Sequence, residues 1–199
     1  MSRIITALLL IVATALPSGV SAATDKENIY NVEVLVFATR LPQLEGNELW
    51  TREAAVANAV TPADADAQAP SPTAPPGILA AAANDLAKDG RFRILAYYSW
   101  IQTADAKSAS KPIRISGTNA KNPDELTGTL RLYLSRYLHL DLNLNYTEKA
   151  SDASLPNTGT GMITYHIDEQ RRIKSQETHY FDHPKFGALI RLTPITTGK

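Results

Sequence analysis

Alternating apolar and polar residues at positions 128–146 form the most regular pattern of the chain. The even positions from Leu130 to Tyr146 carry leucine or tyrosine, except at Arg136, and the odd positions are mostly polar. This period of two predicts a β-strand with one buried and one solvated face. Because nineteen residues exceed the usual length of a strand, we expect curvature or a break. Arg136 then marks a bulge or bend there, or an arginine that is paired inward.

Three further elements are predicted on the N-terminal side of this pattern. Ile29–Thr39 is apolar on both faces, which indicates a central strand covered on both sides. Glu33 interrupts one face; because a lone buried charge is costly, we expect it to pair with an arginine of a neighbouring strand, and a catalytic acid is the alternative. Ile78–Lys88 is predicted as a helix ended by Gly90, and Arg91–Gln102 follows it as a second strand.

Shorter strands are predicted towards the C-terminus. They are an edge strand at Lys111–Gly117, a hairpin formed by residues 163–167 and Arg171–Phe181 around a turn at Asp168-Glu169, and a last strand at Gly187–Pro194. Together these elements predict an α+β fold, a largely antiparallel sheet with one clear helix inserted between the first two strands. Residues 23–199 are expected to form a single domain, in which the Pro/Ala-rich stretch 61–77 is a flexible internal loop.

Residues 1–22 are typical of a secretory signal peptide. Arg3 supplies the positive start, Ile4–Leu16 is an apolar run, and Val20-Ser21-Ala22 offers small residues for cleavage. The run is shorter than the about 20 apolar residues that cross a membrane. We therefore expect an exported protein with no membrane span in its mature form.

The charge balance excludes some classes of partner. The chain has 20 Lys and Arg and 20 Asp and Glu; loss of Arg3 with the signal leaves 19 cations against 20 acids, a net charge of −1. Such a balance argues against nucleic acid, which selects basic surfaces. The absence of cysteine excludes disulfides, thiolate metal ligands and thiol nucleophiles.

The stretch Arg171–Pro184 has the greatest density of groups that can bond, titrate or stack. It contains three cations, two acids, two of the four histidines and a Tyr-Phe pair. The His179-to-His183 spacing superficially fits a metal site, but Pro184 and the strand-like pattern disfavour the helix that such a site would need. We expect no metal, no cofactor and no catalytic residue here, and interpret the stretch as a polar strand and turn with one face available for binding.

Four segments together resemble the CsiV-type family of bacterial proteins, named for a role in cell-shape integrity. They are YNVEVLVF, ILAYYSWIQ, LRLYLSRYLHLDLNL and RRIKSQETHYFDHPKFGALIRLTP, and the resemblance runs from about Ile29 to Pro194. It implies a periplasmic, non-enzymatic peptidoglycan-binding protein that promotes cell-wall synthesis with a penicillin-binding synthase and that synthase's outer-membrane lipoprotein activator. The chain is shorter than the family pattern between the first strand and the helix, so a partner contact made there would be absent.

A ligand made of glycan and peptide fits the polar residues of the chain. Aromatic faces hold sugars, and the arginine fork binds the carboxylates of peptide stems. The candidate ligand-binding residues are Arg171, Arg172, Lys174, Glu177, His179, Tyr180, Asp182 and His183, with Tyr137 and His139 from the wet face of the long pattern; Tyr133 lies on that same face. Two alternatives stay open: an envelope hydrolase using His179, Asp182 or His183, and a pure protein-interaction module.

Overall fold

The computed structural model describes residues 28–40, 66–70, 74–119, 121, 125–149 and 162–196. The expected signal peptide at 1–22 lies outside the described residues, as do parts of the expected loop 61–77 and most of the region between the first strand and the helix. Within that loop, Gln68 is described, and it forms a single parallel bridge with Ile113.

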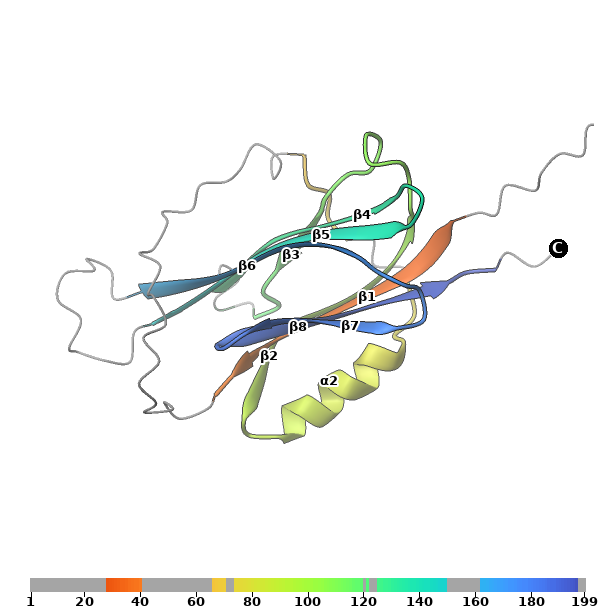
Figure 1. The fold of residues 1–199 in the computed structure, drawn as a ribbon. Helices are drawn as coiled ribbons and strands as arrows, with labels where there is room; N and C mark the ends of the chain where they lie inside the picture. The colour runs from red at the N-terminus through yellow and green to blue at the C-terminus, as the bar shows by residue number, and fades with distance from the viewer. Residues whose placement is uncertain are drawn as a thin grey trace, which may run out of the picture.

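The eight strands of the described residues form two antiparallel four-stranded sheets (Figure 1). Sheet A has the order β2-β1-β8-β7 and contains β1 (Ile29–Thr39), β2 (Phe92–Thr103), β7 (Thr178–His183) and β8 (Phe186–Pro194). Sheet B has the order β3-β4-β5-β6 and contains β3 (Ile113–Ser116), β4 (Leu126–Leu134), β5 (Leu138–Lys149) and β6 (Met162–Arg172). The antiparallel pairing and the helix between the first two strands, α2 (Ile78–Lys88), are confirmed. The strands divide between two sheets rather than one, so the fold is richer in β-structure than the α+β class predicted.

The predicted long strand is a hairpin of β4 and β5. Its break lies at residues 135–137, where the chain turns, and Arg136 is exposed at that turn. Leu134 pairs with Leu138, four positions later, so even positions stay on one face through the turn. This is why the alternation continues unbroken in the sequence although the strand reverses. The expected break is therefore confirmed.

The main core lies between the two sheets. Valines of β1 and leucines of β4 and β5 are fully buried there, among them Val34, Leu132 and Leu140. Burial of one such side chain stabilises the fold by about 2 kcal/mol. The mostly polar side chains at the odd positions of β4 and β5 consequently point away from sheet A and form the outer face of sheet B.

The stretch Arg171–Pro184 does not form one strand. β6 continues through Asp168 and Glu169, which pair with residues of β5, so the turn predicted at these two residues is wrong. The chain leaves sheet B after Arg172, passes through residues 173–177 and joins sheet A as β7 (Figure 1). The physical reason is the length of β5, which offers hydrogen-bonding partners beyond the point where the local pattern suggested a turn.

Helix α2 covers β1 and β2 on the side of sheet A that faces away from sheet B (Figure 1). A second, smaller core of Leu35, Phe37 and Leu79 lies beneath the helix, which explains why β1 is apolar on both faces. The prediction of a central strand covered on both sides is confirmed. At 11 residues, α2 is too short to cross a membrane, and the described part of the chain contains no helix that could.

Glu33 does not form the arginine pair that the sequence suggested. Its buried carboxylate accepts hydrogen bonds from the backbone N–H groups of Gly77, Ile78 and Leu79 and from the Tyr97 hydroxyl, at 2.9 to 3.1 Å. The N-terminus of a helix offers unpaired N–H groups and a partial positive charge, and both stabilise a carboxylate. Burial, and then the hydrogen bond to Glu33, raises the pKa of Tyr97.

Candidate functional site

The two arginines at the end of β6 point in different directions. Arg171 faces sheet A: it donates a hydrogen bond to the Tyr180 carbonyl oxygen at 3.1 Å, and its guanidinium lies 4.2 Å from the centre of the Phe181 ring. It also pairs with Glu169. Arg172 lies on the outer face of sheet B. The side chain of Arg171 thus joins the two sheets, and Arg172 is exposed.

Arg172 contacts aromatic residues of the β4–β5 hairpin. We call Tyr133, Tyr137, His139 and Arg172 together the Tyr137 cluster. The Arg172 guanidinium lies 3.4 Å from the centre of the Tyr137 ring, and Tyr137 is 39% exposed. Arg172 on β6 lies opposite His139 on β5 in the strand register. The His139 ring stacks on that of Tyr133, with the ring centroids 5.1 Å apart. The structure therefore unites two predicted groups, one from the terminal stretch and one from the wet face of the hairpin.

A row of hydrogen-bonding side chains continues from this cluster along the outer face of sheet B. The row, which we call the polar face, consists of His139, Asp141, Asn143 and Asn145 on β5 and of His166, Asp168, Gln170 and Arg172 on β6. Cross-strand bonds order it: Gln170 donates to Asp141 at 2.7 Å and to the Tyr133 hydroxyl at 2.9 Å. Amide and imidazole groups both donate and accept hydrogen bonds, which is the chemistry that sugar hydroxyls need.

The other predicted residues lie around β7 and do not converge. Lys174 and Glu177 form an exposed ion pair at 3.3 Å in the crossing between the sheets. His179 Nε2 lies 2.9 Å from the Lys174 carbonyl oxygen, which ties β7 to that crossing. His179 shares the core side of β7 with Phe181, whereas Asp182 lies on the opposite side.

Tyr180, Asp182 and His183 have partners within their own sheet or at its end. Tyr180 donates a hydrogen bond to Asp182 and stacks on Phe37 at 6.3 Å. Partial burial, followed by this hydrogen bond, raises the pKa of Tyr180 to about 12. His183 Nδ1 accepts a bond from the Lys185 backbone, and its ring contacts those of Tyr165 and Phe186. The described residues contain no group of three or more His, Cys, Asp or Glu that could hold a metal ion.

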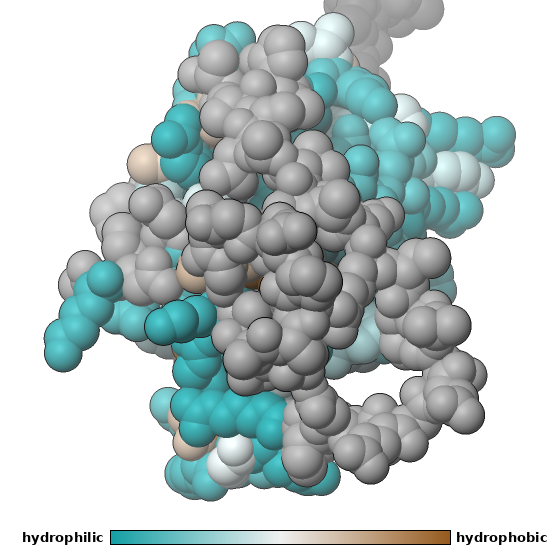
Figure 2. Space-filling view, turned by 90° about the vertical axis from the view of Figure 1, so that its left-hand side faces the viewer, coloured by the Kyte–Doolittle hydropathy of each residue, from teal (hydrophilic) through white to brown (hydrophobic). Residues whose placement is uncertain are grey.

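A basic pocket lies at the opposite end of the sheets. At this end β1 and β5 finish, β2 begins and β7 turns into β8 (Figure 1). Its volume is about 210 Å³. It is lined by Arg40, Arg93, Lys149 and Lys185 together with Ala38, Thr39, Tyr146 and Glu148. Seen from this end of the molecule, the described surface is mostly hydrophilic (Figure 2).

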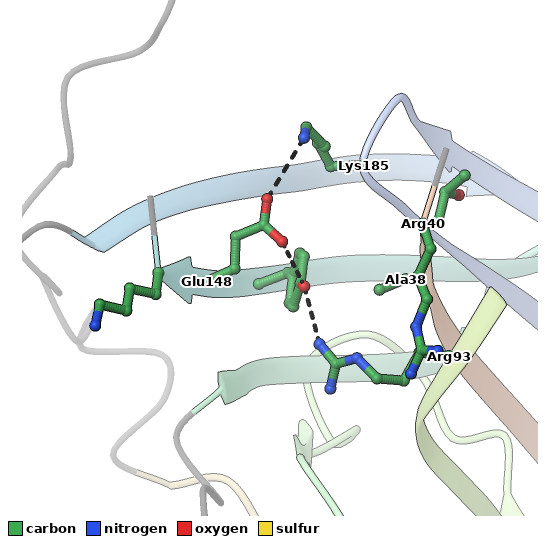
Figure 3. Close-up of a pocket in the computed structure, with 8 residues that line it drawn as sticks. Ala38, Arg40, Arg93, Glu148 and Lys185 are labelled. Atoms are coloured by element: carbon green, nitrogen blue, oxygen red, sulfur yellow. Dashed lines mark hydrogen bonds and ion pairs between the residues drawn. The ribbon is translucent and has the colours of Figure 1, made fainter. Parts of the chain in front are cut away.

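A chain of hydrogen bonds fixes the floor of the basic pocket (Figure 3). Arg93 donates to the Tyr146 hydroxyl at 3.0 Å, that hydroxyl donates to Glu148 at 2.9 Å, and Lys185 lies 3.5 Å from Glu148. Arg93 also pairs with Glu125, and this hydrogen bond raises the pKa of Arg93. Burial, and then the bond to Glu148, raises the pKa of Tyr146. The floor is therefore the neutral phenol of Tyr146, which is held between the charged side chains of Arg93 and Glu148.

The local sequence pattern does not indicate this pocket. Its cations stand at the ends of predicted strands or just beyond the terminal stretch, as Arg40, Arg93 and Lys185 do. A cation next to a strand end is a common feature, and nothing local shows which ends meet. Only the antiparallel order of the two sheets brings these four segments together.

A family described as "Peptidoglycan-binding protein, CsiV" matches residues 4–195 of the chain. The chain belongs to the CsiV family. The match confirms the resemblance found in the four sequence segments, and it includes both the Tyr137 cluster and the basic pocket. Membership of a peptidoglycan-binding family indicates a location in the cell envelope. Searches of curated proteins and of solved structures found no significant match.

Proposed function

We propose that this protein is a periplasmic, non-enzymatic peptidoglycan-binding factor that assists cell-wall synthesis and the maintenance of cell shape. It acts in support of a penicillin-binding synthase and its outer-membrane lipoprotein activator. The observation that carries the binding role is the contact of Arg172 with the half-exposed ring of Tyr137, at one end of the polar face. Family membership supports the choice of ligand.

The polar face suits a glycan strand. The polar face lies on two long neighbouring strands, and its cross-strand bonds hold the side chains in place before a ligand arrives. Tyr137 offers a partly exposed aromatic ring on which a sugar can pack, and Arg172 and His139 supply hydrogen bonds beside it. The repeated Asn, Asp and Gln side chains along β5 and β6 match the repeated hydroxyl and amide groups of an amino-sugar polymer.

Binding without catalysis accounts better for the terminal stretch than hydrolysis does. A hydrolase would need a nucleophile or two acids directed at one point. His179 and Asp182 lie on opposite sides of β7, and each is already hydrogen-bonded within the protein. The proposal therefore assigns no catalytic residue and no cofactor.

Sedimentation with purified, insoluble wall sacculi tests the binding role. The wild type should pellet with the sacculi at low salt, and Tyr137→Ala should weaken binding roughly fivefold, because stacking contributes about 1 kcal/mol. Lys88→Ala, at an exposed position of α2, is the control and should bind like the wild type. A wild-type protein that stays in the supernatant overturns the binding role. Equal binding of wild type and Tyr137→Ala overturns the site.

The supporting role needs a separate experiment. Purified synthase and its lipoprotein activator should form more glycan product when the protein is added, and muropeptide analysis should show no new cleavage product. Unchanged synthesis would contradict the supporting role. New cleavage products, with or without added zinc, would contradict the non-enzymatic assignment.

A further inference from the structure

We propose that the basic pocket binds a carboxylate of the peptide stem of peptidoglycan. This inference rests on the proposed function and adds a second contact to it, at the other end of β5 from the Tyr137 cluster. The glycan would lie on the polar face, and the pocket would hold the charged end of a stem. Four observations lead to this ligand.

The first observation is the charge of the pocket. Arg40, Arg93, Lys149 and Lys185 come from four separate segments, and Glu148 is the one acid among the described residues of the lining. The part of the lining that the structure describes therefore has a formal charge of four minus one, or +3, and still +2 when Glu125, the partner of Arg93, is counted. Like charges held together repel one another, so an anion at this place would stabilise the folded protein.

The second observation is that two of the four cations have acidic partners among the described residues, whereas the other two are available to a ligand. Arg93 bonds Glu125 and Tyr146, and Lys185 bonds Glu148. Arg40 and Lys149 have no acidic partner among the residues that the structure describes. The first pair is therefore held in place by the floor of the pocket, and the second pair can turn to a ligand.

The third observation is the size of the site and the chemistry of its floor. A volume of about 210 Å³ accepts a small group and not a folded domain or a helix. The buried Tyr146 and Ala38 give the floor an apolar part, beside which a short aliphatic side chain next to a carboxylate can pack. Arginine and lysine bind a carboxylate through charge-assisted hydrogen bonds, the strong class of such bonds.

The fourth observation is the distance between the pocket and the Tyr137 cluster. β5 runs from Leu138 beside the cluster to Lys149 in the pocket, 12 residues in all. At about 3.3 Å per residue the strand spans roughly 36 Å. Two separate contacts with one polymer strengthen binding more than either does alone, because the second forms at a high effective concentration. Peptidoglycan is a polymer that carries both sugars and stem carboxylates.

The test uses a double variant, Arg40→Gln with Lys149→Gln, which removes the two available cations and leaves the floor intact. The matched control is Lys88→Gln with Lys111→Gln, which removes two exposed charges elsewhere. Titration calorimetry measures binding of a soluble muropeptide, in one form with free stem carboxylates and in another with those carboxylates amidated. Thermal melting of all variants checks that they fold.

The wild type and the control should bind the free-acid muropeptide at least about tenfold more tightly than the amidated one. The double variant should bind both forms with the same, weaker affinity. Equal affinity of wild type and double variant for the free acid overturns the proposal, as does equal affinity of the wild type for both forms.

Inorganic phosphate separates the two possible sources of an anion. If phosphate binds the wild type and displaces the muropeptide while amidation changes nothing, the pocket takes phosphate and the stem assignment is overturned. Failure of the inference remains distinct from failure of the proposed function. A wild type that pellets with sacculi but ignores amidation overturns the inference alone, and a wild type that does not pellet overturns both.

Discussion

The carboxylate of Glu33 in β1 accepts a hydrogen bond from the backbone N–H of Gly77, 44 residues later, at 3.1 Å. Gly77 is the residue before α2, and it has no side chain with which to cap the helix. Glu33 replaces that cap from the neighbouring sheet. A Cβ atom at position 77 would lie 2.3 Å from Glu33 Oε2, so the absence of a side chain is what allows the contact.

Gly77→Ala should destabilise the protein by about 2 kcal/mol or more. The methyl group would displace a buried carboxylate from its N–H donors, and a buried charge that loses its partners is costly. Urea denaturation monitored by circular dichroism measures the loss.

The matched control is Gly90→Ala, at the other end of α2. A Cβ atom at position 90 would have no other atom within 4 Å, so the free energy of unfolding should change by less than about 0.5 kcal/mol. Equal effects of the two substitutions would contradict the role of Glu33 as the cap of α2.

Arg172→Lys should weaken binding to sacculi by about twofold to fivefold. Lysine keeps the positive charge, but it cannot stack a planar guanidinium on Tyr137, and such a contact at an exposed site contributes about 0.5 to 1 kcal/mol. Sedimentation over a series of protein concentrations measures the affinity.

The same exchange at Arg91, which is exposed and pairs with Asp89 at 2.6 Å, serves as the control. If Arg172→Lys binds like the wild type, a positive charge is enough at this position and the stacking argument fails.

Tyr180→Phe should make the free energy of unfolding depend less strongly on pH in the alkaline range. The pKa of Tyr180 is raised from 10.0 to about 12 in the folded protein, so the neutral phenol is favoured there more than in the unfolded chain. Its contribution to stability is fully present below pH 10 and is lost as the pH rises towards about 12. Urea midpoints across this range, compared between the wild type and Tyr180→Phe, measure it.

An absorbance titration of the phenolates gives an independent check. The difference between the wild type and Tyr180→Phe should titrate near pH 12 rather than near pH 10. A difference that titrates near pH 10 would contradict the partial burial of Tyr180 and its hydrogen bond to Asp182 in solution.

The candidate site could be predicted from the sequence in part. Strand parity selected Tyr137 and His139, the density of polar groups selected Arg172, and the structure brings these three together. The same density of polar groups also selected Arg171, one residue earlier, which instead joins the two sheets. A one-residue step reverses the direction of a side chain on a strand, so the outcome depended on the register of β6 against β5.

The local elements of this protein follow from its amino-acid sequence alone. The spacing of side chains along the chain predicts the bounds of α2, the buried and solvated faces of β4 and β5, and the two apolar faces of β1. The tertiary structure alone decided which strands pair. It divided them into two sheets, gave Glu33 a helix as its partner and gathered four distant cations into one pocket. The physical reason is that strands pair through backbone hydrogen bonds, which are the same for nearly every residue, so the choice among partners depends on packing across the whole domain.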